Sequence, residues 1–262
     1  MPNVVCNESQ FPSIREAAEQ EHRLRRRIER ALAVGKRKRA RYFTALYLKS
    51  GSAKLVATIE SNKKLKPHRK VKSERVPEIA AGLDPWKGTD ESVSVNAVAK
   101  HSNPNDQRII FDFGIQNRAL QILVREALRP WAQLHPNQFA IQGGRRAASE
   151  AVLEALGDGF RWAVQADIKD CFNTFDDEEV ARSLPIPEEV TRAVITTQHL
   201  NITSGNITEL LGMTELLVEV RQGIPHGSAV SSLVAEMLLG INRRYSHHQR
   251  HSPEISLYTY HG

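Results

Sequence analysis

The stretch that most constrains the fold is residues 221–240, RQGIPHGSAVSSLVAEMLLG. From Val230 to Ile241 apolar residues recur at intervals of three and four, which predicts a helix with one buried stripe. Ser228 is a suitable N-cap for that helix. Glycines in the preceding turn, residues 222–227, remove side chains that would keep a ligand away from the backbone. Taken alone, this stretch is more often an ordinary turn than a ligand site.

A second stretch, residues 162–175, reads WAVQADIKDCFNTF. Over its first seven residues an apolar series alternates with Ala163, Gln165 and Asp167, and this period of two predicts a β-strand. Asp167 lies near the end of this otherwise apolar strand. A carboxylate at such a position is costly unless it is paired or binds a metal ion, so Asp167 is a candidate metal ligand.

Together the two stretches resemble two characteristic blocks of the reverse transcriptase palm. The family's first block is a strand ending in Asp-Ile with an aromatic residue five positions after the Asp, here Asp167, Ile168 and Phe172. The second block, Gln-Gly-x-Pro-x-Gly-Ser-x-x-Ser, is matched at every position from Gln222 to Ser231. The blocks occur in the family's order, with about fifty residues between them.

The resemblance implies a role for each residue of these blocks. Asp167 and the backbone carbonyl of Ile168 would bind Mg²⁺. Phe172 would stack under the sugar of the incoming nucleotide and exclude a 2′-hydroxyl, although a core phenylalanine is the alternative. Gln222 and Gly223 would line the pair formed by template and nucleotide. The remaining positions of the block would contact nucleic acid: Pro225, Gly227 and Ser228.

Residues 107–131 resemble the fingers of the same family. A strand is expected over Gln107–Phe113, followed by a helix over Asn117–Trp131 that begins at an Asn-Arg pair. The resemblance places the guanidinium of Arg108 on the incoming triphosphate, which suits arginine because it can offer phosphate two parallel donors. The alternative is a surface arginine on a strand. Lys100 is a second candidate for a phosphate contact.

Residues 138–146, QFAIQGGRR, resemble the next fingers block. A Gly-Gly pair replaces the commoner spacing, so the block carries over only loosely. Arg145 and Arg146 are expected to touch the template backbone or, equally, to be surface arginines at the start of a helix.

The net charge of +6 hides a strong asymmetry. Residues 1–75 carry 20 Lys and Arg against 7 Asp and Glu, whereas the rest carries 16 against 23. A basic region attached to an acidic body suggests a polyanionic partner such as nucleic acid, although a solvated basic face is the alternative. Contacts to phosphate in residues 61–76 would be independent of sequence and sensitive to salt. The candidates there are Lys63, Lys64, Lys66, Arg69 and Lys70.

Composition is that of an ordinary globular protein, with 40% apolar and 25% charged residues. No apolar run is long enough to span a bilayer, and the N-terminus lacks the pattern of a secretory signal. The two cysteines, Cys6 and Cys171, are far apart, which argues against a disulfide framework or a zinc site. A cytoplasmic location is therefore expected.

The resemblance and the element pattern predict an α+β fold in three parts. These are a basic helical region and linker (residues 1–76), fingers (77–158) and an incomplete palm (159–262). Residues 77–105 are expected to be loop with short strands, and Asn201–Met213 to be polar and rich in turns. The acids at 176–178 are expected only to mark a helix start. Further helices are expected over residues 12–34, 39–60, 147–156 and 188–200.

The function implied is that of an RNA-directed DNA polymerase acting on an RNA template, a DNA primer and dNTP. Such transfer uses two metal ions, and one carboxylate cannot hold both. The family's second Asp pair should follow a strand like Ile255–Tyr260, so the chain is expected to be a fragment. The alternative is an inactive, RNA-binding relative. An RNA polymerase is disfavoured because the bulky Phe172 would exclude ribonucleotides. His247, His248 and His251 are expected to be an exposed cluster rather than metal ligands.

Overall fold

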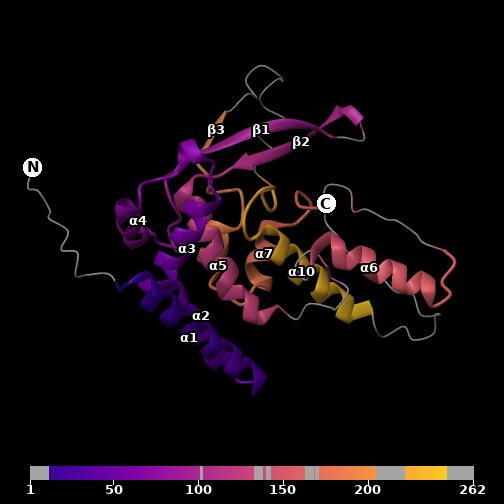
Figure 1. The fold of residues 1–262 in the computed structure, drawn as a ribbon, viewed down its shortest axis with the longest axis horizontal. Helices are drawn as coiled ribbons and strands as arrows, with labels where there is room; N and C mark the ends of the chain where they lie inside the picture. The colour runs from indigo at the N-terminus through magenta and orange to yellow at the C-terminus, as the bar shows by residue number, and fades with distance from the viewer. Residues whose placement is uncertain are drawn as a thin grey trace, which may run out of the picture.

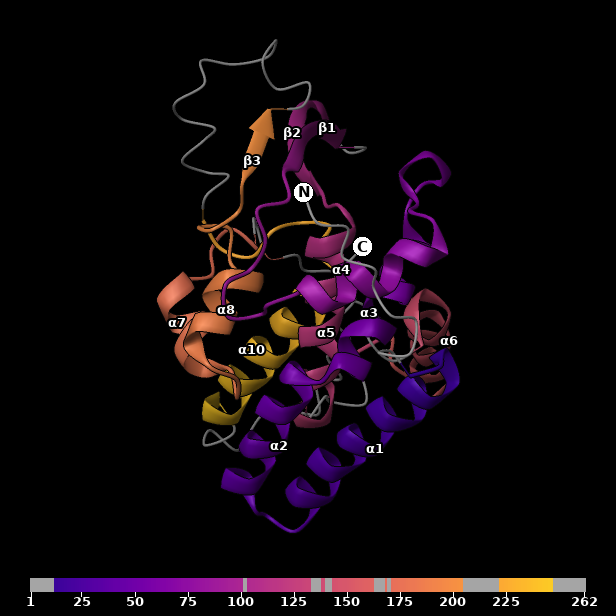
Figure 2. The same ribbon diagram turned by 90° about the vertical axis from the view of Figure 1, so that its left-hand side faces the viewer.

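The computed structural model describes residues 12–100, 103–132, 138–139, 143–162, 168, 171–204 and 222–246. This part of the chain combines helices with a small three-stranded sheet, so the α+β class is confirmed. Figure 1 shows helix α5 at the centre, with helices α1 and α2 at one end of the molecule and the sheet at the other. Figure 2 shows the same arrangement from the side, with α7 and α8 along one flank.

The N-terminal region forms three helices, α1 (Ile14–Ala33), α2 (Arg37–Lys49) and α3 (Gly51–Lys64). Ser13 begins α1 with a capping box in which its side chain and that of Glu16 satisfy each other's backbone amides. The single helix expected over residues 39–60 is wrong. Ser50 is extended, with φ −67° and ψ 122°, and its side chain accepts a hydrogen bond from the amide of Ala53. Ser50 therefore ends α2 and caps α3.

The segment expected to be a linker contains short helical turns. These are the 3₁₀ turns η2 (Pro67–Arg69) and η3 (Ser73–Arg75), followed by helix α4 (Val76–Gly82). Next, strands β1 (Val93–Lys100) and β2 (Asn103–Asp112) form an antiparallel hairpin, so most of the expected loop is regular structure.

The third strand, β3 (Ile202–Ser204), pairs in parallel with β1 and gives the order β2-β1-β3. The sequence predicts turns over Asn201–Met213. The structure describes residues 201–204 of this range, and Ile202–Ser204 form strand β3. The buried side chains of Val93, Val95, Phe111, Phe113 and Leu200 form a small core beneath the sheet.

Helix α5 (Ile115–Leu128) continues into the 3₁₀ turn η4 (Arg129–Trp131). The later helices are α6 (Gly144–Gly157), α7 (Asp177–Ser183), α8 (Glu188–Val194) and α10 (Ser231–Ser246). Helix α8 ends six residues earlier than the expected boundary at residue 200. None of the helices in the described ranges is both long and apolar enough to cross a membrane.

One apolar core runs through the helical part of the molecule. Its buried members include Ile28 on α1, Leu48 on α2, Leu123 on α5, Val190 on α8 and Val234 on α10. These residues come from all three parts expected from the sequence, and α3 packs closely along α5. The basic N-terminal helices are thus built into the body of the protein, while the part boundaries stay predictions.

Candidate functional site

The two motif stretches meet in the structure. In the turn before α10, the amide nitrogen of Ile224 donates a hydrogen bond to the carbonyl oxygen of Phe172 at 2.9 Å. Gly223 lies at this contact with φ +71°, and a Cβ there would be 2.2 Å from the same oxygen. Both the backbone conformation and the space therefore require glycine at position 223.

Asp177 anchors the same turn from α7. Its Oδ1 accepts a hydrogen bond from the amide nitrogen of Gly223 at 3.0 Å, and its side chain is buried. Burial raises the pKa of this carboxyl above its ordinary value, an effect that the bond from Gly223 opposes and the charge of Asp176 reinforces. Asp176 caps α7 by accepting from the amide of Glu179 at 2.8 Å, as a helix-start acid should.

On its other side the turn is held by strand β2. The amide of Phe111 donates to the carbonyl oxygen of His226 at 3.1 Å. Gly227 has φ +91°, and a Cβ there would be 2.8 Å from the carbonyl oxygen of Phe111. The ring of His226 meets the ring of Phe172 edge-on, with centroids 4.6 Å apart. The turn therefore joins the strand that carries Arg108 to the loop that carries Phe172, and Figure 1 shows it between the sheet and α7.

The start of α10 differs from the prediction. The helix begins at Ser231, so Ser228 is not its N-cap, and the Ser228 hydroxyl instead accepts from the amide of Val230 at 3.4 Å. The Ser231 hydroxyl donates to the carbonyl oxygen of Pro225 at 2.8 Å. Pro225 and Ser228 are thus held by hydrogen bonds within the turn, and these bonds take the place of a side-chain cap on α10.

Gln121 on α5 supports this turn and was missed by the sequence reasoning. Its Oε1 accepts from the amide of Ala229 at 3.1 Å, and the side chain is buried. The sequence places Gln121 between Leu120 and Ile122 in an apolar helix. Because a buried side-chain amide needs a hydrogen-bond partner, this position could have indicated a long-range contact. Asp177 gave no comparable signal, since an acid in the first helical turn has an ordinary explanation.

The exposure of the motif residues is uneven. Gln222 and Gly227 are exposed, whereas Gly223 and Pro225 are buried. Phe172 is half-buried and packs against the main core, so one face contacts the protein interior. In this turn Gln222 therefore offers an exposed side chain to a ligand, and Gly227 leaves its backbone exposed.

Several predicted site residues lie outside the described part. Asp167 is one, as are the expected strand Ile255–Tyr260 and the three histidines of the C-terminal segment. Ile168 is described and is 51% exposed. In the hairpin, the backbone of Arg108 lies opposite Val98 and that of Lys100 lies opposite Asn103. The structure describes the backbone of Arg108 and Lys100 and not their side chains.

The predicted phosphate-binding residues of the N-terminal region lie at the end of α3 and around η2. Four of them are exposed: Lys63, Lys64, Lys66 and Lys70. Arg69 forms an ion pair with Asp112 at the end of β2, with Nη1 and Oδ1 2.6 Å apart. Arg145 and Arg146 are exposed at the start of α6, and Arg146 pairs with Glu150 one turn later. These residues thus occupy two separate places on the molecule.

Within the described residues no group of three or more His, Cys, Asp or Glu side chains could hold a metal ion. The Mg²⁺ expected at Asp167 therefore stays a prediction. A scan against protein-family models and a search of curated proteins each find no match to this chain. The assignment of a function rests on the residues and on their geometry.

Proposed function

We propose that the chain is the fingers and part of the palm of an RNA-directed DNA polymerase. The observation that supports the proposal is the contact between two sequence blocks about fifty residues apart, through the Ile224–Phe172 hydrogen bond and the glycine at 223. Both blocks resemble those of reverse transcriptases. A loop bearing a half-buried aromatic residue beside an exposed glutamine is suited to hold a nucleotide between them.

In this proposal each residue has a defined task. The exposed Gln222 and the backbone at Gly223 line the pair of template base and incoming nucleotide. Phe172 lies under the sugar, where its ring, braced by His226, leaves no room for a 2′-hydroxyl. Arg108, on the strand that braces the turn, binds the triphosphate, with Lys100 as a second contact.

The metal belongs to the same proposal. Asp167 and the carbonyl of Ile168 would hold Mg²⁺, which, when bound, supplies charge neutralisation and activation of the primer 3′-hydroxyl. Exposed lysines and arginines would track the phosphates of template and primer. Nucleic-acid binding of this kind weakens steeply with salt.

The test is primer extension on an RNA template, with protein made from the whole reading frame that encodes this chain. Asp167→Ala should abolish extension and leave template binding nearly unchanged, because the substitution removes a metal ligand and no phosphate contact. Phe172→Val should raise ribonucleotide incorporation relative to deoxyribonucleotide. Extension by Asp167→Ala at the wild-type rate would remove the enzymatic assignment.

A catalytically inactive RNA-binding protein is the second candidate, favoured by the many exposed cations of α1 and α2. It predicts template binding without extension in the wild-type protein. The exposed cations on these helices are Arg15, Arg23, Arg26, Arg27, Arg30, Arg37, Lys38, Arg39, Arg41 and Lys49.

A further inference from the structure

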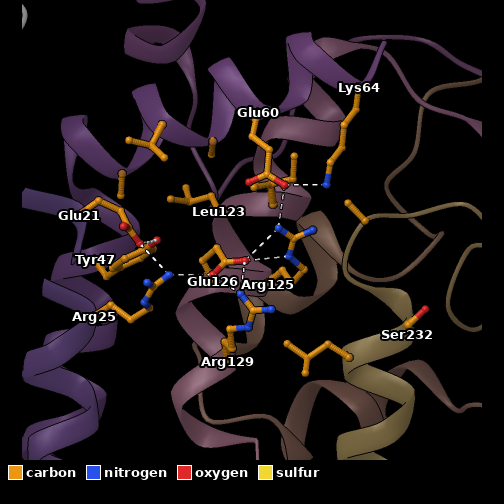
Figure 3. Close-up of a pocket in the computed structure, with 16 residues that line it drawn as sticks. Glu21, Arg25, Tyr47, Glu60, Lys64, Leu123, Arg125, Glu126, Arg129 and Ser232 are labelled. Atoms are coloured by element: carbon orange, nitrogen blue, oxygen red, sulfur yellow. Dashed lines mark hydrogen bonds and ion pairs between the residues drawn. The ribbon is translucent and has the colours of Figure 1, made fainter. Parts of the chain in front are cut away.

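A hollow of about 590 Å³ lies between α1, α3, α5 and the first turn of α10. Its apolar lining comes from Val56 and Ala57 on α3, Ile122 and Leu123 on α5, and Leu233 on α10. Charged side chains occupy much of the rest of its wall, as Figure 3 shows. The volume is within the range of small-molecule sites, which combine apolar walls with a few polar groups.

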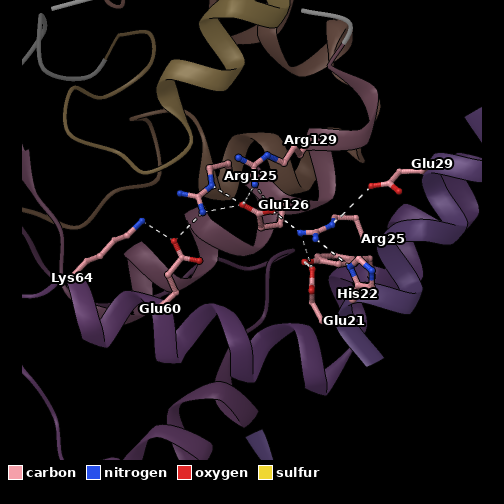
Figure 4. Close-up of polar contacts among 10 residues, drawn as sticks. Glu21, His22, Arg25, Glu29, Glu60, Lys64, Arg125, Glu126 and Arg129 are labelled. Carbon is pink, nitrogen blue, oxygen red and sulfur yellow. Dashed lines mark hydrogen bonds and ion pairs between the residues drawn. The ribbon is translucent and has the colours of Figure 1, made fainter. Parts of the chain in front are cut away.

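Three guanidinium groups converge on one carboxylate in this wall. Glu126 accepts from Arg25 at 3.0 Å and from Arg129 at 3.3 Å, and lies 2.9 Å from a guanidinium nitrogen of Arg125. Arg125 also reaches Glu60, which pairs with Lys64 (Figure 4). The lining carries four cations against the three carboxylates of Glu21, Glu60 and Glu126, a net charge of +1.

This network leaves hydrogen-bond donors unused. Arg125 binds through Nε and Nη2, and Arg129 through Nη1. Within the described part of the chain, Nη1 of Arg125 and Nη2 of Arg129 donate to no other group. Arg129 is also 57% exposed along its side chain, so its guanidinium can turn toward a ligand.

The opposite wall is the amino end of α10. Ser232 lines the hollow there, is exposed, and its hydroxyl makes no hydrogen bond among the described residues. Figure 3 shows Ser232 across the hollow from Arg125 and Arg129. The amino end of a sixteen-residue helix adds a positive potential on the same side.

We propose that this hollow binds a small phosphorylated ligand with an apolar or aromatic body, of the kind represented by a nucleoside monophosphate. The phosphate lies between Arg125, Arg129 and Ser232, with Lys64 at the rim. Arginine and hydroxyl donors suit phosphate oxygens, and the net positive charge favours a dianion. The body of the ligand lies against Val56, Ile122 and Leu233. The site is separate from Gln222 and from the nucleotide position of the proposed function.

The test is a fluorescence-anisotropy titration of the full chain with AMP carrying an N-methylanthraniloyl group. Unlabelled AMP and inorganic phosphate serve as competitors, and both should displace the probe. Arg129→Gln should weaken binding by about tenfold, since it removes a charge-assisted hydrogen bond. Ser232→Asp should weaken it at least as much, because it places a negative charge opposite the arginines and removes no bond within the described part.

Ser232→Asp also guards against misfolding, because an acid in the first turn of a helix favours the helix. Arg15→Gln is the matched control, since Arg15 is an exposed arginine on α1 that pairs with Glu19 and does not line the hollow. Gln222→Ala separates this site from the proposed polymerase site. Both controls should keep wild-type affinity.

Three outcomes would overturn the proposal. The first is the absence of saturable probe binding to the wild-type chain. The second is equal affinity in Ser232→Asp and wild type, and the third is loss of binding in Gln222→Ala, which would place the probe in the polymerase site. If Ser232→Asp weakens binding of a short single-stranded RNA while AMP does not bind, the hollow takes backbone phosphate and the mononucleotide assignment is wrong.

Discussion

Gly223 carries the contact between the two motif loops, so its substitution is the sharpest test at the scale of single residues. Gly223→Ala adds a Cβ 2.2 Å from the Phe172 carbonyl oxygen and imposes a positive φ on alanine. The backbone of one loop must move, and we expect a loss of about 2 to 3 kcal/mol in the free energy of unfolding. Urea denaturation followed by circular dichroism measures it.

Gly240→Ala is the matched control for that substitution. Gly240 lies inside α10, and apart from its own stretch of helix no described atom is within 4 Å of the Cβ it would gain. Replacing glycine by alanine in a helix stabilises it by about 0.5 to 1 kcal/mol, so the two variants should change stability in opposite directions. Equal stability of Gly223→Ala and wild type would mean that the two loops do not touch as described.

Asp177 makes the stability of the turn depend on pH. Because burial raises the pKa of its carboxyl in the folded protein, the folded state binds the proton more tightly than the unfolded state. The contribution of Asp177 to stability therefore falls as pH rises from the ordinary aspartate pKa through the raised one. Asp177→Asn keeps an acceptor for the Gly223 amide without a charge, so it should be more stable than wild type at neutral pH.

The measurement is the difference in unfolding free energy between Asp177→Asn and wild type, taken from pH 3 to 7. The difference should grow with pH and then level off. Asp177→Ala should cost about 1 to 3 kcal/mol at low pH, because the buried amide of Gly223 loses its acceptor, and less as pH rises, because the variant lacks the carboxyl whose pKa is raised. If the unfolding free energies of Asp177→Asn and wild type differ by the same amount from pH 3 to 7, the pKa of Asp177 is not raised in the folded protein.

At the scale of elements, the acidic and basic side chains between α1, α3 and α5 act as one clamp. Glu126 is the common acceptor of three arginines and is only 11% exposed along its side chain. Glu126→Gln removes the carboxylate that the three guanidinium groups share, although Arg125 keeps its pair with Glu60 and Arg25 its pair with Glu21. We expect a loss of about 2 to 3 kcal/mol, less than for a fully buried pair because water reaches the hollow.

Glu150→Gln on α6 is the control for the clamp. Glu150 is 61% exposed and, among the described residues, pairs only with Arg146, so the change should stay within about 0.5 kcal/mol. Guanidinium chloride would screen the charges, so urea is the denaturant to use. If both variants unfold at the same urea concentration, the clamp contributes nothing beyond ordinary surface pairing.

Elements with a long apolar stripe or a clear cap could be predicted from the sequence. The helix after the Gly-Pro turn, the helix over residues 117–131 and the first helix all occur near their expected bounds. The break at Ser50 could not be placed, because the apolar spacing continues across it and only the extended backbone of Ser50 separates α2 from α3. Strand β3 has three residues and exists through its pairing with β1, which no local pattern encodes.

The candidate site was foreseen in part for the same reason. The glycines at 223 and 227 follow from the motif, and the structure supplies the contacts that require them. The bond from Gly223 to Asp177 joins residues 46 positions apart, and the bond from Ala229 to Gln121 spans 108. Long-range hydrogen bonds of this kind depend on tertiary packing, which a single sequence does not display.

At the scale of the whole molecule, the distribution of charge separates residues 1–75 from the rest of the chain, whereas the packing joins the two regions. Residues 1–75 are strongly basic, which on the sequence alone suggests a separate arm. In the structure most of these cations are exposed, while Ile28, Leu48 and Ala53 from the same region belong to the core that includes Leu123. Trp131 donates through Nε1 to the hydroxyl of Thr44 on α2 at 3.0 Å, a further tie between the two regions.

The last prediction follows from this shared core. A chain of residues 66–262, without α1 to α3, should fail to fold cooperatively, because it would expose the apolar side of α5 that α3 covers. Co-expression of residues 1–65 with 66–262 should restore a one-to-one complex with the native Trp131 fluorescence. The measurement is heteronuclear NMR of the long fragment alone and with the short one. A well-dispersed spectrum from residues 66–262 alone would show instead that the basic helices are an independent arm.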